Sequence, residues 1–455
     1  MSELPLAGRR RGFGFAITAT MLMMIAASAP SPFYPELAAQ FELPPVAITL
    51  IFAVYAFTML ATLLLTGALS DTVGRRPVIA TGSVVLAASL LLFWQSGGLA
   101  MLLIARALQG IAAGLLLPAL SAMVVDFAPP RQSEAASLWN TIAAMTGLGI
   151  GAITSAFVLD LVVDASSAVF GTLAVVFILA AAVVWATPDS TRSTRSARST
   201  RSTGVRVERS RSERPRSHLA VPARLRRPLG VAVPAIIAGW ATNGLFLALA
   251  SSLVAQEFGA TTHAQQSVAI PIFAVAGIIT SVLLRRRSAR LVSVYGTSAL
   301  GVGTALSLLA LALNSLPVYL LTVAVVGTGF GTAFMGVLKT LMPRVGPTER
   351  AAVMAVIYTV SYLAFGVPTI VAGLLVPVAT LRGAMTVVGV VIVVLCAVAT
   401  MRRLRIRDVP DGNEAAHPVT ELSDVLVERA DRDGAASAAS ASGERGSRGR
   451  AGEGR

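Results

Sequence analysis

Twelve apolar stretches run along the chain and are separated by short polar segments. A helix needs about 17–25 mainly apolar residues to cross a bilayer, and the stretches have that length. Because the bilayer core offers no water to bond the backbone, each crossing segment must be helical. The pattern therefore predicts an all-α membrane protein with twelve transmembrane helices, at 13–33, 46–69, 77–94, 99–125, 135–159, 168–186, 229–253, 268–284, 291–313, 317–340, 351–376 and 384–401.

Arginines divide the polar segments into two alternating kinds. They cluster at 9–11, 75–76, 131, 192–227, 285–290, 344–350 and 402–407, and the segments between are acidic or neutral apart from Arg382. Cytoplasmic loops carry the excess of Lys and Arg in membrane proteins. The alternation fits twelve crossings with both termini cytoplasmic, and an odd number would break it. We therefore expect a multi-pass protein of the cell (inner or plasma) membrane.

The two halves of the chain share a glycine pattern. Gly110 and Gly114 match Gly327 and Gly331, each 217 residues later. We expect two pseudo-symmetric six-helix bundles, at 13–186 and 228–401, preceded by a cytoplasmic tail at 1–12. The segment 187–227 would join them as a cytoplasmic linker, and the polar segment 402–455 is predicted to be a disordered cytoplasmic tail.

Composition narrows the class of protein. The chain is 55% hydrophobic and only 13% charged, with a mean hydropathy of +0.74, whereas soluble domains are about a quarter charged. Much of the net charge of +14 comes from the linker, which holds twelve arginines against three acidic residues. Such a basic segment is typical of contact with anionic lipid. Its repeat at 190–203 lacks aromatic residues for base stacking, so no nucleic-acid partner is expected.

Nothing in the sequence indicates an enzyme. Cys396 is the one cysteine, and the three histidines fall in predicted loops or in the tail. We therefore expect no internal disulfide, no bound metal and no cofactor. A phosphate-binding loop of the form G-x-x-x-x-G-K-(S/T) is absent, which disfavours an ATP-driven pump.

The polar turn after the second expected helix has a specific sequence, GALSDTVGRRPVI at 67–79. It resembles the signature loop of the major facilitator superfamily, G-x-L-(A/S)-D-x-x-G-R-R. The matching residues are Gly67, Asp71, Gly74, Arg75 and Arg76. The resemblance implies two six-helix bundles that rock about a substrate site at their interface.

The resemblance also implies a role for this turn in conformational gating. Gly67 would let another helix approach, and Gly74 would permit the tight turn. Asp71 and Arg75 would form a charge network with Asp126, near the end of the fourth expected helix, and so latch the two halves on the cytoplasmic side. The alternative is a solvated hairpin tip that merely obeys the positive-inside rule, but this accounts for neither the acid nor the glycines.

A second motif lies in the fourth expected helix, where Arg106, Gln109 and Gly110 match the family pattern R-x-x-Q-G. An arginine inside a span costs about 2.5–3.5 kcal/mol on insertion scales, so it needs a partner or a wet cavity. The resemblance implies a place near the substrate cavity and, in proton-coupled members, a role in coupling. The alternative is an arginine that snorkels to the membrane interface, since it lies only seven residues into the span.

In the fifth expected helix, Gly147 and Gly151 partly match the G-x-x-x-G-P-x-x-G-G pattern of drug:proton antiporters. Ala152, Ser155 and Ala156 depart from it. Close helix packing is the competing interpretation of this spacing.

Polar and aromatic residues within the spans are the candidate substrate-binding residues. No Asp or Glu lies in the middle of any expected span, so the sequence does not support proton coupling through a mid-membrane carboxylate. Titration at Asp71 or Asp126, or coupling through Arg106 and the substrate, are the remaining routes. As a set the candidates predict a neutral, aromatic pocket for an amphiphilic molecule, although each alone could serve only in packing. They are Tyr55, Asn140, Trp240, Asn243, Tyr358 and Tyr362.

Together these features predict a monomeric secondary transporter of the major facilitator superfamily, resembling its drug-efflux branch. It would export a small organic molecule by alternating access, with the proton as the candidate coupling ion. Two alternatives stay open: proton-linked uptake of a small organic solute, and a membrane sensor whose basic loop recruits partners.

Overall fold

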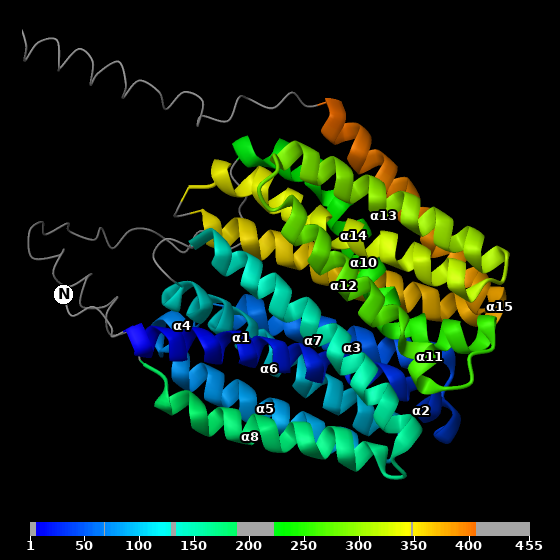
Figure 1. Ribbon diagram of the computed structural model, residues 1–455, viewed down its shortest axis with the longest axis horizontal. Coiled ribbons are helices and arrows are strands. Elements are labelled where there is room, and N and C mark those ends of the chain that lie inside the picture. The colour runs from blue at the N-terminus through cyan, green and yellow to red at the C-terminus, as the bar shows by residue number, and fades with distance from the viewer. Residues whose placement is uncertain (1–5, 68, 129–132, 189–222, 347–348, 406–455) are drawn as a thin grey trace, which may run out of the picture. The chain divides into compact units, whose positions relative to one another are not determined.

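The computed structural model describes residues 6–67, 69–128, 133–188, 223–346 and 349–405, and its ordered elements there are helices. Those up to Leu404 belong to one unit. Eleven of these helices are long and apolar enough to cross a membrane. The all-α class expected from the apolar pattern is therefore confirmed for the described residues (Figure 1).

The first half of the chain contributes six crossings. Its long helices are α1 (Leu6–Ser28), α3 (Pro45–Thr66), α5 (Arg75–Trp94), α6 (Leu99–Phe127) and α7 (Ser133–Leu161), and the sixth crossing combines a π-helical turn (Ser167–Gly171) with α8 (Thr172–Val183) and a final turn (Val184–Ala186). Short elements lie between them: η1 (Ser31–Phe33), α2 (Tyr34–Gln40) and α4 (Leu69–Thr72).

The second half begins with α10 (Ala223–Phe258) and the short α11 (His263–Ser267), which leads into α12 (Ala269–Leu284). It continues with α13 (Ala289–Ala312), α14 (Leu316–Leu341), a 3-10 turn (Met342–Arg344) and α15 (Arg350–Arg405). The expected linker lies mostly at 189–222 and the expected C-terminal tail mostly at 406–455, both outside the described residues.

The first crossing departs from the single helix expected at 13–33. α1 starts earlier and ends at Ser28, and the chain continues through η1 and α2. Pro30 and Pro32 stand at this break, and each removes a backbone donor and clashes with the preceding turn. The segment from Tyr34 onward, expected as a loop, is therefore helical, and Tyr34 is buried.

The last two expected helices join in one 56-residue element, α15. A straight helix of this length would be about 80 Å long, far more than the roughly 30 Å of a bilayer core. The backbone leaves the helical region at Thr380, with φ 60 and ψ 168, so the element is two helices that meet at a kink. The Thr380 hydroxyl accepts a bond from the Gly383 amide at 3.3 Å, as an N-cap residue does. With this division the described residues contain the twelve expected crossings.

Within each half, a glycine brings two helices into backbone contact, and the helix pairs of the two halves are equivalent. A Cβ at Gly110 would overlap the Tyr55 carbonyl oxygen, so α6 touches α3 directly. In the second half, a Cβ at Gly327 would overlap the Phe273 carbonyl oxygen, so α14 touches α12 in the same way. These contacts join the second crossing to the fourth and the eighth to the tenth, as pseudo-symmetry requires.

The helix bundle has two opposite faces (Figure 1). The terminal face, where α1 begins and α15 ends, carries Arg75, Arg285 and Arg402. The distal face, at the other ends of these helices, carries Asp160, His263 and Thr380. Between the halves, α7 packs against α12, and α3 packs against α15. A Cβ at Gly373 of α15 would overlap the Thr49 hydroxyl of α3, so these two helices are close near the distal face.

Candidate functional site

Arg106 lies fully buried in the first half, on α6. Its Nε donates to the Tyr34 hydroxyl at 2.8 Å, and Nη2 donates to the same oxygen. Nη1 donates to the Ala27 carbonyl at 3.3 Å and to the Gln109 side-chain oxygen. The Gln109 amide in turn donates to the Ala26 carbonyl at 2.9 Å. The snorkelling alternative is therefore wrong for this conformation, because the guanidinium is held inside the bundle.

Four aromatic rings enclose the same guanidinium. The Arg106 Cζ lies 5.4–5.6 Å from the ring centroids of Tyr34, Phe52, Tyr55 and Phe93. A cation over an aromatic face gains about 0.5–2 kcal/mol, more when it is desolvated. The rings and the hydrogen bonds together replace water around the charge. Tyr34 was not a candidate from the sequence, because nothing marks a residue 72 positions away as the partner of Arg106.

The aromatic cluster continues from this site into the second half. Phe52 stacks on Phe365 of α15 at a centroid distance of 5.0 Å, and Phe365 contacts Trp240 of α10 at 6.1 Å. Trp240 also packs against Tyr362 at 5.2 Å, and Tyr362 lies 6.3 Å from Tyr358. The structure thus brings together four of the six predicted substrate residues, Tyr55, Trp240, Tyr358 and Tyr362, through Phe52 and Phe365.

The two predicted asparagines are placed differently. Asn243 is buried in α10 at 7% exposure, and neither asparagine has a hydrogen bond to the cluster within the part of the chain that the structure describes. The Asn140 side-chain oxygen and the Trp240 indole nitrogen are both buried without a hydrogen-bond partner among the described residues. Because buried polar atoms are nearly always bonded, these two are candidates for contact with a bound molecule.

A small cavity of about 40 Å³ lies elsewhere, inside the second half. Thr242, Phe246, Thr304 and Tyr319 are among its lining residues, and none of the predicted substrate residues is. Pockets for organic ligands measure about 300–1,000 Å³, so this cavity is too small to be the substrate site.

The turn between α3 and α5 is built as its second glycine suggests. Gly74 adopts φ 110 and precedes α5, a conformation that favours glycine. A Cβ built at Gly67 would lie 2.7 Å from the Leu63 carbonyl oxygen of its own helix, and no other described helix lies within 4 Å of it. The approach of a second helix at Gly67 stays a prediction.

The charges of this turn contact the neighbouring elements of the first half. Arg75 Nε lies 2.8 Å from Asp126 Oδ2, in the last turn of α6, and Arg76 donates to the Thr187 carbonyl. The Asp71 side chain lies outside the described residues. The ion pair that can be described therefore joins α5 to α6, and a latch between the halves at this face stays a prediction.

Gly147 and Gly151 lie where α7 meets α1. A Cβ at Gly147 would overlap the Met21 carbonyl oxygen, and a Cβ at Gly151 would lie 2.5 Å from the Ile25 carbonyl oxygen. Packing accounts for both glycines in this conformation.

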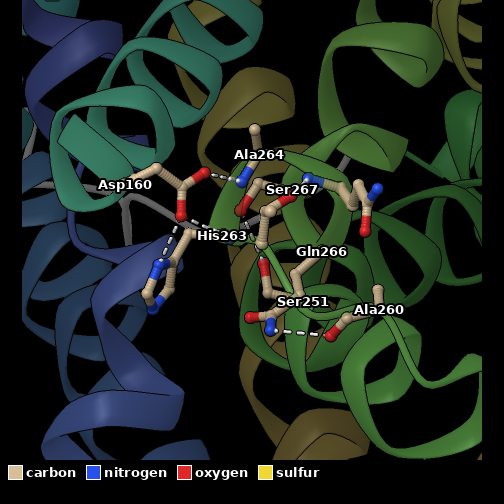
Figure 2. A network of polar contacts seen from close by, with 9 residues as sticks. Asp160, Ser251, Ala260, His263, Ala264, Gln266 and Ser267 are labelled. Atoms are coloured by element: carbon tan, nitrogen blue, oxygen red, sulfur yellow. Dashed lines mark hydrogen bonds and ion pairs between the residues drawn. The ribbon is translucent and has the colours of Figure 1, made fainter.

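At the distal face, one carboxylate joins the two halves (Figure 2). Asp160, in the last turn of α7, accepts three bonds from the start of α11. The donors are the His263 amide at 2.8 Å, the His263 ring Nδ1 at 2.8 Å and the Ala264 amide at 2.9 Å. These three bonds therefore connect the two halves at the distal face. The sequence placed both residues in loops and did not single them out.

Arg382, the exception to the charge alternation, has a partner on the same face. Its Nε lies 2.8 Å from Glu257 Oε2, so the kink after Thr380 is tied to the end of α10. An arginine held by a carboxylate adds little net positive charge to its face, which agrees with the alternation of the other segments.

Two helical bundles with helices long and apolar enough to cross a membrane define a polytopic membrane protein. Residues 16–367 match the family model described as Major Facilitator Superfamily, and the chain belongs to this family.

Solved structures agree on the fold. One is a bacterial homolog to the human lysosomal transporter Spinster in an inward-facing and unoccupied conformation, with a TM-score of 0.68 and 13% identity, covering 89% of this chain and 99% of that one. Another is a D-xylose-proton symporter, with a TM-score of 0.67 and 14% identity, covering 85% of this chain and 96% of that one. A search of curated proteins finds no match. At this identity the likeness shows the fold alone.

Proposed function

We propose that this transporter exports a small organic, amphiphilic molecule by alternating access between the two halves. The aromatic cluster that crosses from Phe52 to Phe365 carries the proposal, because it places stacking surfaces from both halves at one site. The neutral lining of Tyr55, Trp240 and Tyr362 suits an apolar ring system with few polar groups.

The Asp160 contact is proposed to hold the distal face closed. Opening that face must break three hydrogen bonds between α7 and α11. If the arginine-rich terminal face is cytoplasmic, as the charge alternation predicts, the conformation described is closed to the outside. Arg75 and Asp126 would then act in the opposite closure, at the terminal face, together with Asp71.

Proton-linked uptake is the second candidate, and one observation favours it. A structure of the same fold is a D-xylose-proton symporter. The two candidates differ in the direction of net transport, which the fold does not determine.

Cells that produce the protein provide the test. The levels of aromatic metabolites and of added fluorescent amphiphiles inside the cells are compared with those in cells carrying Trp240→Ala. Trp185→Ala is the matched control, because Trp185 is 56% exposed on the outside of the bundle. Export predicts lower internal levels with the parent protein and with the control than with Trp240→Ala. Higher levels would establish uptake, and equal levels of every compound would refute the proposal.

A further inference from the structure

We propose that the transport site selects against organic cations and takes neutral or anionic aromatic molecules that present a hydrogen-bond acceptor. This inference rests on the proposed function and specifies its substrate class. It starts from Arg106, whose hydrogen-bond partners are all neutral: a phenol, an amide and a backbone carbonyl. Four hydrogen bonds hold the guanidinium, but none of these partners neutralises its charge.

The acidic residues cannot supply the missing charge. Within the described candidate spans they lie near the ends, at Glu36, Asp126, Asp160 and Glu257. The last three are already engaged, with Arg75, His263 and Arg382 respectively. Arg106 lies seven residues inside its span, or roughly 10 Å along the helix. Among the described residues, the interior of the first half therefore carries one positive charge without a carboxylate partner.

This charge acts on the interface between the halves through apolar rings. The Arg106 Cζ lies 5.4 Å from the Phe52 centroid, and Phe52 lies 5.0 Å from Phe365. A charged group bound beside Phe365 would thus be about 10 Å away. At an effective dielectric constant of about 20, the interaction changes the dissociation constant by about 15-fold for each unit of ligand charge. An anion gains this factor, and a cation loses it.

The rings and the polar atoms of the site also favour a neutral or anionic ligand over a cation. Aromatic faces often bind organic cations, but the faces of Phe52 and Tyr55 already contact the guanidinium. On the opposite side, the buried Trp240 indole nitrogen has no acceptor among the described residues. An indole N–H can only donate, so it suits a carboxylate, carbonyl or ether oxygen.

Three matched probes test the charge preference: 2-naphthoate, 2-naphthamide and 2-naphthylmethylammonium, which share a ring system and carry charges of about −1, 0 and +1 at neutral pH. Their binding to the full-length protein in nanodiscs is measured by equilibrium dialysis. We expect the naphthoate to bind at least tenfold more tightly than the ammonium probe, with the naphthamide between them.

Gln109→Glu is the decisive variant. The Gln109 side-chain oxygen already accepts a bond from Arg106, so a glutamate there places a negative charge beside the guanidinium and leaves the arginine in place. The preference for naphthoate over the neutral naphthamide should fall by about 15-fold, the factor worked out above for one unit of charge. Gln109→Met changes the same position without adding charge and should keep the preference. Thermal unfolding of both variants verifies that they are folded.

The outcomes separate this inference from the proposed function. Tighter binding of the ammonium probe, an unchanged preference in Gln109→Glu, or no binding of any probe would overturn the inference. Transport of the ammonium probe into proteoliposomes would support the transporter while refuting the charge selection. Charge-selective binding without transport of any bound probe would refute the proposed function alone.

Discussion

Replacing Asp160 by asparagine should shift the transporter toward a state that is open at the distal face. The carboxylate accepts two backbone bonds and one ring bond from the start of α11. Asparagine keeps one acceptor oxygen but turns an amide toward the second donor, so at least one bond is lost together with the charge. A hydrogen bond to a charged group contributes about 1.5–3 kcal/mol.

Partial exposure lowers this contribution, since the Asp160 side chain is 19% exposed and that of His263 is 30% exposed. We take about 2 kcal/mol as the cost to the closed state. Each 1.4 kcal/mol changes an equilibrium tenfold, so the ratio of open to closed molecules should rise by about 30-fold.

Distances between labels across the distal face measure this ratio. Val163 of the first half and Leu313 of the second are exposed there, at 108% and 64% of their reference areas. Each is changed to cysteine after Cys396→Ala, since Cys396 is the chain's single cysteine. Electron paramagnetic resonance distance distributions should gain a longer population in Asp160→Asn.

Asp164→Asn provides the control. It removes the same charge four residues away, from a carboxylate that bonds the Ser167 amide within its own half. Its distances should match those of the parent protein. If Asp160→Asn also matches the parent, or if both variants open equally, the contact does not hold the distal face closed.

Three further predictions concern the rest of the fold. Asp126→Asn should reduce transport while leaving the protein in the membrane, because Arg75 loses its ion-pair partner, and normal flux in vesicles would contradict this. Gly147→Leu should prevent recovery of folded protein, since the leucine side chain would enter the α1 backbone. A Cβ at Gly14 has nothing within 4 Å, so Gly14→Ala is the control and should behave like the parent in size-exclusion chromatography. Thr380→Gly should stabilise the protein by about 1 kcal/mol. The backbone region at φ 60, ψ 168 costs residues other than glycine about 1–3 kcal/mol, and glycine is a tolerable N-cap. A lower melting temperature would refute this.

The sequence predicted the crossings because a bilayer imposes one rule on every segment, that it be helical and apolar. It predicted less well where local backbone geometry decides the outcome. Pro30 and Pro32 stand at the break after α1, but the helix that follows, with Tyr34 at its start, has no comparable signal in the sequence. The joint at Thr380 lacks a glycine at the strained position, so the sequence indicated an ordinary loop.

Long-range pairs were the part that the sequence could not provide. Arg106 could be recognised as a buried charge that needs partners, yet its contacts with Tyr34 and Phe93 depend on how separate helices pack. Asp160 and His263 meet only because α7 and α11 approach each other across the two halves. Their types alone, an acid and a histidine near helix ends, are too common to indicate a contact.

The glycine contacts between α3 and α6 also limit how the buried charge can move. α6 carries Arg106, and its Gly110 leaves no gap to the Tyr55 carbonyl of α3. Phe52 and Thr49 of the same α3 face α15 of the other half. When α15 slides or tilts past α3, Arg106 must keep its place relative to α3 and change its place relative to α15. The electric field at the transport site would thus differ between the two end states of the cycle, although no proton or ion need bind to change it.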